Sequence, residues 1–340
     1  MPSAADDVAD AVTRAGGAIR FDAFLELALY GPHGFYVAGG RAGRRGDFLT
    51  SPEVGPLFGE LVARAVDRCW HALGRPARID VVDVGAGPGT LARSVALAAH
   101  EAKGAARYVA VEASPTQRAA HPATVESSHA LPDGITGLVV ANELLDNLPF
   151  RLFVMDGGWQ EAWVARDGDR FVEVLRPADP LPSALPAGAP HGARFPVQER
   201  AAAWLADVRA RLRAGALVVI DYARRTDDFA VRPWREWLRT YAGHVRGGHY
   251  LGDVGRQDVT CEVSVAQLAA VRPPDAISTQ AQWLAGLGID ALVEGGRRAW
   301  VAAAARPDVA AMRMRSRASE ATALTDPAGL GAFTVLEWRA

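Results

Sequence analysis

The sequence has few of the residues that metal centres and disulfide frameworks need. Its 340 residues include two cysteines, Cys69 and Cys261, which stand far apart, and its eight histidines show no ligand spacing such as HExxH. Two isolated cysteines fit neither a disulfide framework nor a zinc pattern. We therefore expect no metal site, and we expect a protein of the reducing cytoplasm.

Signals for membranes and for nucleic acids are also missing. The chain has no run of about 18 apolar residues, the length that a membrane span requires. Its first segment, MPSAADDVADAVTRAGG, is acidic and lacks the apolar centre of a secretory signal. The formal net charge is −2, and arginines alternate with acidic residues along the chain. A nucleic-acid binder would carry a basic footprint, so we expect neither a membrane nor a nucleic acid as partner.

The chain does have enough apolar material for a core and an alternation of strands with helices. Hydrophobic residues make up 49% and charged residues 22% of the sequence, which is a normal globular composition. The runs RIDVVDVG, RYVAVEAS and TGLVVANE predict strands, and TLARSVALAAHEA predicts a helix between the first two. Such alternation is typical of a parallel sheet with helices on both faces, and the continuous apolar strands indicate burial on both sides.

Segments on either side of this Rossmann-like core do not continue the alternation of strands and helices. Residues 7–30 predict helices, and the glycine-rich stretch 31–55 predicts a long functional loop. Residues 224–262 are polar, glycine-rich and aromatic, which indicates an insertion or a flap over the substrate. We therefore expect an α/β fold in four regions: 1–75 with N-terminal helices and a cofactor-covering loop, 76–223 as the core with an antiparallel meander at 150–192, 224–275 as the flap, and 276–340 with C-terminal helices and a final strand.

Three glycines follow the first of these strands, in VVDVGAGPGTL. A dinucleotide-binding loop has the pattern GxGxxG, with an acidic residue about 20 positions later. Here Gly85, Gly87 and Gly89 form GxGxG, so the third glycine comes one residue early, and Pro88 removes a backbone amide. The glycines still allow the backbone to pass close to a ligand. The loop therefore favours a nucleoside without a pyrophosphate, and an NAD-dependent oxidoreductase is disfavoured.

Two acidic residues stand at the ends of the strands beside this loop. Asp83 lies two residues before the first glycine, and Glu112 closes the next predicted strand. Ligands of open α/β sheets bind outside the carboxyl ends of the strands. Asp83 can accept from an ammonium group or orient the loop amides, and Glu112 can accept from both hydroxyls of a ribose. S-adenosylmethionine has a ribose and an amino-acid moiety and no phosphate, so these residues predict it as the cofactor.

The chain resembles a known family along nearly its whole length. The segments LYGPHGFYV, GDFLTSPEVGPLFGEL, VEASPTQR and ANELLDNLPFRLF occur in the order in which similar segments occur there. The family is that of the class I S-adenosylmethionine-dependent methyltransferases related to a mitochondrial complex I assembly factor, a protein arginine methyltransferase, and to its bacterial homologues. The resemblance implies a class I methyltransferase fold, S-adenosylmethionine as cofactor, and methyl transfer to a protein side chain of arginine type.

Departures from the family pattern leave other functions open. Asp83 stands where the family commonly has Glu, and Ala86 where it often has Pro. ANELLDNLP lacks the two aromatic residues of the family's ANEFFDALP, which would flank the reaction site. A small-molecule O- or N-methyltransferase, for example for a secondary metabolite, is therefore an alternative. A cofactor-binding assembly or scaffold protein with little turnover is an alternative of a different class.

The segment ANELLDNLP also holds the candidate catalytic residues. Glu143 and Asp146 follow a buried strand and stand three positions apart. Two carboxylates can hold a guanidinium in a fork, or orient an amine and take its proton. The alternative is that Asp146 caps a helical turn and that Glu143 binds backbone amides. The resemblance favours the catalytic roles, and Asn142 at the end of the strand is a candidate cofactor contact.

The long loop and the flap contribute further candidates. Thr50 and Ser51 open the segment TSPE, which is a helix-start pattern with Ser51 as the N-cap. At a helix N-terminus both hydroxyls could face the methionyl carboxylate of the cofactor. His244 in the flap is a candidate general base or substrate contact, although a lone histidine is commonly structural. Tyr36 and Phe48 are candidates for the pocket wall, or else buried aromatics of the loop.

Overall fold

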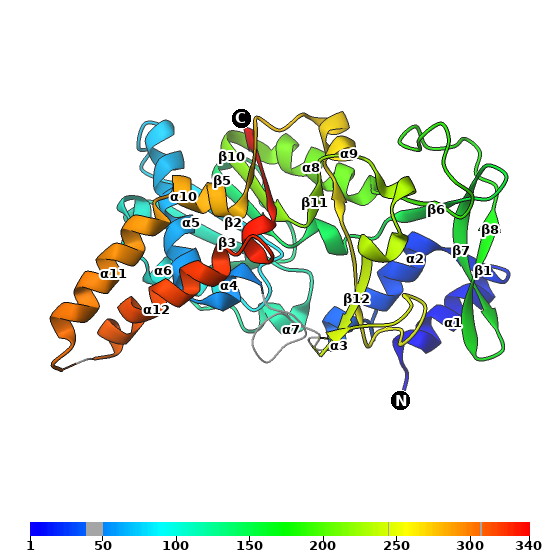
Figure 1. Cartoon of the computed structure of the whole chain (residues 1–340), viewed down its shortest axis with the longest axis horizontal. Helices are drawn as coiled ribbons and strands as arrows, with labels where there is room; N and C mark the ends of the chain where they lie inside the picture. The colour runs from blue at the N-terminus through cyan, green and yellow to red at the C-terminus, as the bar shows by residue number, and fades with distance from the viewer. Residues whose placement is uncertain (39–49, 244, 307) are drawn as a thin grey trace.

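The computed structural model describes residues 1–38, 50–243, 245–306 and 308–340, and at the centre of this part lies a mixed seven-stranded sheet (Figure 1). The strand order is β16-β17-β10-β5-β2-β3-β4. Strands β10, β5, β2, β3 and β4 are parallel, which confirms the expected parallel sheet, whereas β17 is antiparallel to both β10 and β16. The strands are β2 (Ile79–Val84), β3 (Ala106–Val111), β4 (Glu126–Ser128), β5 (Ile135–Asn142), β10 (Leu212–Asp221), β16 (Ala276–Thr279) and β17 (Thr334–Arg339).

Helices cover both faces of this sheet because alternate residues of its strands point to opposite sides. In β2, Ile79 and Val81 pack in a core with α5 and α6, and Val82 and Val84 pack in a second core with α8 and α9. The strands therefore read as continuous apolar runs, as both faces are buried. The helices are α5 (Pro56–Ala72), α6 (Thr90–Leu97), α8 (Glu199–Arg211) and α9 (Val265–Val271).

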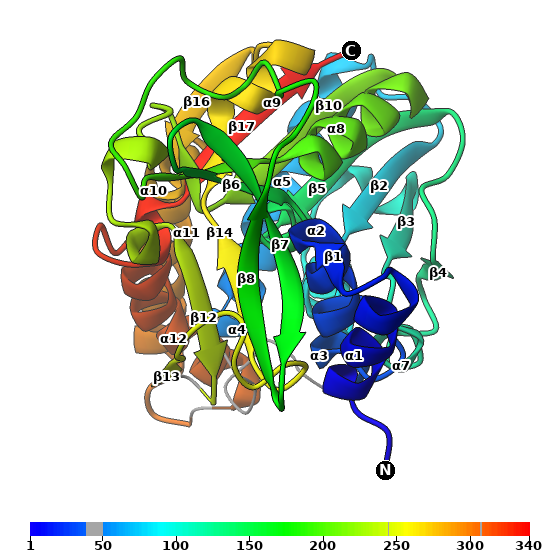
Figure 2. The ribbon, with the colours of Figure 1, turned by 90° about the vertical axis from the view of Figure 1, so that its right-hand side faces the viewer.

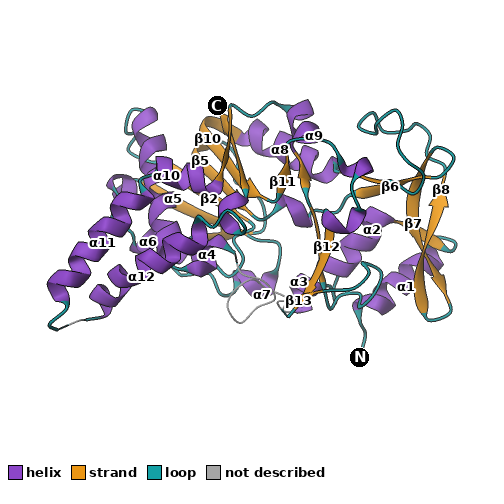
Figure 3. Ribbon diagram, in the orientation of Figure 1, coloured by secondary structure: helices purple, strands orange, loops and turns teal. Residues whose placement is uncertain are grey.

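A second sheet lies beside the core and contains the expected antiparallel meander. Its strand order is β1-β7-β6-β9, and β8 is a further strand that pairs with β7. Figure 3 shows β7 and β8 at one end of the elongated molecule, at the opposite end from the helices α11 (Ile289–Ala303) and α12 (Val309–Leu324). The elements are α1 (Ala4–Arg14), β1 (Ala18–Arg20), α2 (Phe21–Leu25), β6 (Arg151–Met155), β7 (Trp159–Asp167), β8 (Arg170–Arg176) and β9 (Arg194–Val197).

The prediction of helices throughout 7–30 is wrong at β1. Gly16 and Gly17 have φ values of 76° and 109°, so the backbone leaves α1 in a conformation that other residues rarely adopt. Residues 18–20 then pair with Trp163, Val164 and Ala165 of β7. A three-residue strand has too short a pattern to be recognised locally, because its partner lies far along the chain.

The flap region has a small sheet of its own, in the order β13-β12-β14, which can be followed in Figure 2. Two residues after β10, the short strand β11 pairs with β15, which directly precedes α9. The flap shares one hydrophobic core with the second sheet and the N-terminal helices, through residues such as Trp237 and Phe21. The strands are β11 (Ala223–Arg224), β12 (Leu238–Ala242), β13 (Val245–Arg246), β14 (Asp258–Cys261) and β15 (Val263–Ser264).

The C-terminal helices return the chain to the N-terminal part of the core. Helices α10 (Gln280–Gly286), α11 (Ile289–Ala303) and α12 (Val309–Leu324) precede β17, which confirms the expected final strand. Glu320 of α12 accepts a hydrogen bond from the Leu57 amide at 2.9 Å and so satisfies the first turn of α5. Within the described ranges, none of the helices is long and apolar enough to cross a membrane.

Candidate active site

A cavity of about 340 Å³ lies at the carboxyl ends of β2, β3 and β5. The glycine-containing loop after β2 forms one wall, and the turn after β5 forms the opposite wall. The N-terminal segment and the short helix α4 (Ser51–Val54) contribute the remaining sides. The predicted site residues in its lining are Thr50, Asp83, Gly85, Gly87, Glu112, Asn142 and Glu143.

The three glycines of the loop are in the left-handed region of backbone conformation. Their φ values are 73° for Gly85, 53° for Gly87 and 78° for Gly89. A side chain would be strained at each position. A Cβ atom would also lie 3.0 Å from Leu144 Cδ1 at the first glycine and 3.2 Å from Gln117 Oε1 at the second. The loop therefore forms a cradle that admits a ligand close to the backbone.

Glu112 connects this loop to the segment after β3. Its Oε2 accepts from the Gly87 amide at 3.0 Å, and its Oε1 accepts from the Ser114 amide at 2.7 Å. Burial raises the pKa of Glu112, and these two amides oppose that shift. Each carboxylate oxygen can accept a second hydrogen bond. The side chain is thus held rigidly at the cavity wall with room for two further donors.

Asp83 is nearly inaccessible, at 3% exposure, although it borders the cavity. The Tyr108 hydroxyl donates to its Oδ2 at 3.0 Å, and burial raises the pKa of Asp83 to about 7. The amides of Gly85 and Ala86 donate to the Val111 carbonyl, at 2.9 and 3.1 Å. The Val111 carbonyl therefore orients these amides, which was one of the two roles expected for Asp83. The other expected role, contact with an ammonium group, stays a prediction.

The prediction that Ser51 is a helix N-cap is wrong. The helix α4 begins at Ser51 itself, with Thr50 in the N-cap position and no side-chain capping bond. The Ser51 hydroxyl is fully buried and donates to Gln280 Oε1 at 2.8 Å, because α10 packs against this turn. The Ser51 amide donates to Glu143 Oε1 at 3.3 Å. Thr50 borders the cavity, and Ser51 supports its wall from behind.

Glu143 has the most unusual backbone of the candidate residues. Its φ is 53°, a conformation that costs energy for a residue with a side chain and that is found mainly where function demands it. Its amide donates to the Ile220 carbonyl at 2.8 Å, and its Oε1 accepts from Asn142 Nδ2 at 2.9 Å. Burial raises the pKa of Glu143 to about 8. The carboxyl group is therefore fixed in the cavity and readily holds a proton near neutral pH.

Asp146 and two further carboxylates lie one layer deeper. Asp146 is 3% exposed and does not line the cavity, and within the described residues its Oδ1 has no hydrogen-bond partner. Burial raises its pKa well above the usual range, and the charges of Asp221, Asp258 and Glu143 add to this. Asp221 accepts from the amides of Leu145 and Tyr222, both at 2.8 Å. Of the two carboxylates expected to hold a guanidinium together, Glu143 therefore lies at the cavity wall and Asp146 lies in the layer behind it.

Aromatic side chains from the N-terminal segment complete the cavity. The rings of Tyr30 and Tyr36 stack with centroids 5.4 Å apart, and both line the cavity. They stand on the same side as Asn147, whose carbonyl accepts from the Tyr30 hydroxyl at 3.2 Å. The aromatic side chains of the cavity on this side therefore come from the N-terminal segment, since ANELLDNLP contributes none.

Sequence reasoning missed Tyr30, Asp221 and the cavity-lining Glu53. A usable signal existed for Asp221, because it is the last residue of the apolar strand β10, much as Asp83 is the penultimate residue of β2. Glu53 accepts from the Thr90 hydroxyl at 2.6 Å, and no local pattern indicates that contact. The candidates His244 and Phe48 lie outside the described residues.

A mostly parallel sheet with helices on both faces and a ligand cradle directly after the inner strand β2 is the fold of class I methyltransferases. A family model described as "Putative S-adenosyl-L-methionine-dependent methyltransferase" matches residues 61–278. The chain belongs to this family. It is accordingly an S-adenosyl-L-methionine-dependent methyltransferase, and the glycine cradle without Cβ atoms fits that cofactor.

A crystal structure of a "likely methyl transferase from Burkholderia thailandensis bound to S-adenosyl-homocysteine" is similar with a TM-score of 0.83 and 27% identity, over 99% of this chain and 92% of that chain. The Danio rerio protein named "Protein arginine methyltransferase NDUFAF7, mitochondrial" is 26% identical over 82% of this chain and 75% of its own length. A Drosophila melanogaster homologue of that name is 31% identical over 44% of this chain, and the match spans 41% of the Drosophila protein.

Proposed function

We propose that the protein methylates a guanidinium nitrogen of an arginine-type side chain in a protein acceptor. The observation that carries this proposal is the cluster of three carboxyl groups, those of Glu143, Asp146 and Asp221, at and behind the cavity wall. Within the described ranges, Glu143, Asp146 and Asp221 form no ion pair with a lysine, arginine or histidine. Buried carboxylates without a cationic partner are costly, and a bound guanidinium would compensate for them.

The cofactor side of the cavity has polar groups that suit the ribose and the methionyl part of S-adenosyl-L-methionine. In this proposal Glu112 receives the two ribose hydroxyls, and Asp83 faces the ammonium group. The loop from Gly85 to Gly89 passes beside the nucleoside. Asn142 Oδ1 is buried and has no partner among the described residues, so it is available to a polar hydrogen of the ligand. Thr50 stands near the methionyl end.

Glu143 is the group that would touch the acceptor. Its carboxylate would orient the guanidinium, and Asp146, one layer deeper, would not contact the acceptor. The bound cofactor supplies an electrophilic methyl group, whose bond to sulfur breaks as the bond to nitrogen forms, leaving S-adenosyl-homocysteine. The methylated guanidinium must lose one proton. Glu143, with its pKa raised to about 8, is placed to accept that proton.

Names given to the relatives support the choice of acceptor. The Danio rerio and Drosophila melanogaster proteins are both named protein arginine methyltransferases. Their sequence identity to this chain is low, so the choice of arginine depends mainly on the carboxyl groups of Glu143, Asp146 and Asp221. The tyrosines at 30 and 36 add to it, because aromatic faces attract cations.

The test is the transfer of a labelled methyl group from S-adenosyl-L-methionine to proteins of a cell extract, followed by acid hydrolysis and separation of the amino acids. We expect label in methylated arginine with the wild type and at least a hundredfold slower labelling with Glu143→Gln, on the scale of a lost general base. Glu161→Gln is the matched control, since Glu161 is a buried carboxylate of the second sheet that pairs with Arg151 at 2.6 Å. It should label at the wild-type rate.

Other outcomes distinguish the alternatives. Label confined to small molecules would contradict the protein acceptor and favour a small-molecule methyltransferase. Label in a methylated residue other than arginine would contradict the guanidinium. If the wild type binds the cofactor with no transfer to any acceptor, the enzymatic proposal fails and a scaffold role takes its place.

A further inference from the structure

A series of hydrogen bonds crosses the cavity from its cofactor side to its acceptor side. Glu112 Oε1 accepts from the Ser114 amide at 2.7 Å, and the Ser114 hydroxyl donates to the Tyr36 carbonyl at 3.3 Å. The Tyr36 hydroxyl donates to Asp258 Oδ1 at 3.0 Å. Tyr36, in the short helix α3 (Phe35–Ala38), therefore links the end of β3 to the start of β14.

Asp258 in turn holds the turn that carries Asp146. Asn147 Nδ2 donates to Asp258 Oδ1 at 3.1 Å and to Oδ2 at 3.3 Å. Asn147 and Asp146 belong to the same short helix, η3 (Leu145–Asn147). The Tyr30 hydroxyl, which donates to the Asn147 carbonyl at 3.2 Å, attaches the N-terminal segment to this turn a second time. Both connections end on the acceptor side of the cavity.

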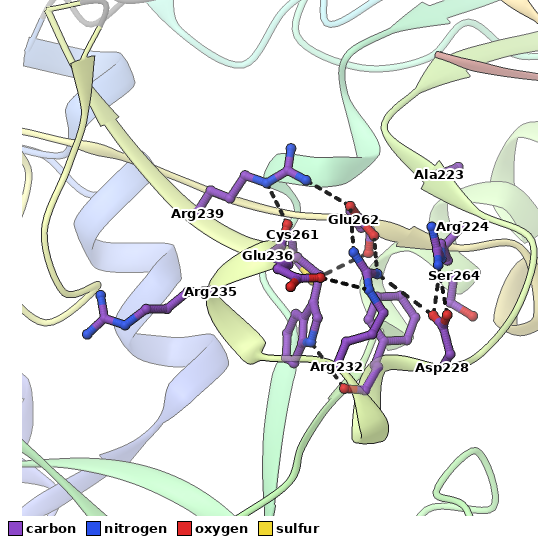
Figure 4. A network of polar contacts seen from close by, with 12 residues as sticks. Ala223, Arg224, Asp228, Arg232, Arg235, Glu236, Arg239, Cys261, Glu262 and Ser264 are labelled. Carbon is purple, nitrogen blue, oxygen red and sulfur yellow. Dashed lines mark hydrogen bonds and ion pairs between the residues drawn. The ribbon is translucent and has the colours of Figure 1, made fainter. Parts of the chain in front are cut away.

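The strand β14 is a firm base for these contacts because ion pairs fix its far end. Figure 4 shows two arginines meeting at Glu262, the residue directly after β14. Arg232 Nη1 lies 2.7 Å from Glu262 Oε2, and Arg239 Nη2 lies 2.8 Å from Glu262 Oε1. Arg239 also belongs to β12, the neighbouring strand. These ion pairs therefore tie the end of β14 to β12 and to the segment that precedes β12.

We propose that Tyr36 and Asp258 are positioning residues that order the acceptor site when the cofactor binds. Ribose hydroxyls on Glu112 would fix the turn to Ser114, and Ser114 would fix the backbone of Tyr36. The Tyr36 hydroxyl would then hold Asp258, and through it η3. This inference rests on the proposed function, which places the acceptor beside η3. The cofactor end and the acceptor end of this series of hydrogen bonds can be tested separately.

Hydrogen exchange with and without S-adenosyl-homocysteine tests the coupling without any acceptor. In the wild type, the ligand should slow exchange in the glycine loop, in residues 112–118, and also in 144–148 and 258–261. In Tyr36→Phe, which keeps the ring and removes the hydroxyl, we expect protection in the first two segments only. Exchange reports local opening on this scale.

Tyr250→Phe is the matched control for this hydroxyl deletion. The Tyr250 hydroxyl donates to Glu173 Oε2 at 2.6 Å and lies outside the cavity lining. It should keep the wild-type pattern in all four segments. If Tyr36→Phe does not fold, Asp258→Asn tests the same link from its other end. Equal ligand-induced protection of 144–148 in the wild type and in the variant that folds would overturn the proposal.

A binding measurement separates this inference from the acceptor assignment. With N-acetyl-arginine amide as the probe, we expect S-adenosyl-homocysteine to tighten binding about fivefold or more in the wild type and less than twofold in Tyr36→Phe. Should the probe bind both proteins with the same dependence on S-adenosyl-homocysteine, the coupling is overturned and the arginine site stands. If it fails to bind the wild type while protection still depends on Tyr36, the acceptor assignment fails and the coupling stands.

Discussion

Replacing Glu143 by glutamine should stabilise the protein at alkaline pH while it slows methyl transfer strongly. The side chain lies beside Asp221 and accepts hydrogen bonds from Asn142 and from the Ser51 amide. Burial is the largest cause of its raised pKa, which shifts from 4.5 to about 8, and the charge of Asp221 adds to it. Glutamine keeps the size and one acceptor oxygen but carries no charge at any pH.

The magnitude follows from the difference between the pKa of Glu143 in the folded and the unfolded chain. Because the folded pKa is the higher one, the stabilisation is complete below pH 4.5 and is lost as the pH rises through about 8. At about 1.4 kcal/mol per unit, the loss between pH 5 and pH 8 integrates to roughly 3.5 kcal/mol. Water in the cavity screens part of this, so we expect about 2–3 kcal/mol.

Urea unfolding followed by tryptophan fluorescence at several pH values between 5 and 8 measures this difference. The free energy of unfolding of Glu143→Gln minus that of the wild type should rise by about 2–3 kcal/mol across the range. The rise should be steady above pH 5. A difference that stays constant with pH would refute the reasoning, because it would mean that Glu143 ionises alike in the folded and unfolded chain.

Other predictions concern the cofactor, the loop and the pH dependence. Glu112→Ala should weaken binding of S-adenosyl-L-methionine by about 1.5–3 kcal/mol in calorimetry, and unchanged affinity would place the ribose elsewhere. Gly87→Ala, at a φ of 53°, should lower the free energy of unfolding by about 1–2 kcal/mol and weaken cofactor binding. Cofactor affinity equal to that of the wild type would contradict the role of the glycine loop as a ligand cradle. Glu320→Ala should cost about 1 kcal/mol in urea unfolding, since it removes the acceptor for the Leu57 amide. The initial rate with an arginine acceptor should increase as the pH rises towards 8, because ionised Glu143 binds the cation; a flat profile would argue against this role.

Much of the cofactor side could be predicted from the sequence, because it depends on short segments. Apolar runs define β2, β3 and β5, and the carboxyl ends of parallel strands meet at one edge of a sheet. Asp83, Glu112 and Glu143 stand at those ends and therefore meet around one cavity. The three glycines of the loop were recognisable for the same reason, since their role depends on the backbone of a single turn.

The side of the cavity that we propose for the acceptor depends on contacts between distant segments, which no local pattern encodes. Ser51 follows the rule for a helix N-cap, yet its hydroxyl bonds to Gln280 of α10. The depth of Asp146 behind the cavity wall depends on how the turn after β5 packs against β10 and β14.

The sequence alone therefore determined the parallel core, the glycine cradle and the acidic strand ends, because strand periodicity and turn chemistry are local properties. Tertiary structure alone decided how side chains from distant segments meet at the acceptor site that we propose. Tyr30 and Tyr36 from the N-terminal segment reach Asn147 and Asp258 only after the segments between them have folded. Packing of whole elements brings such residues together, and the energy of that packing belongs to the folded chain rather than to any of its segments.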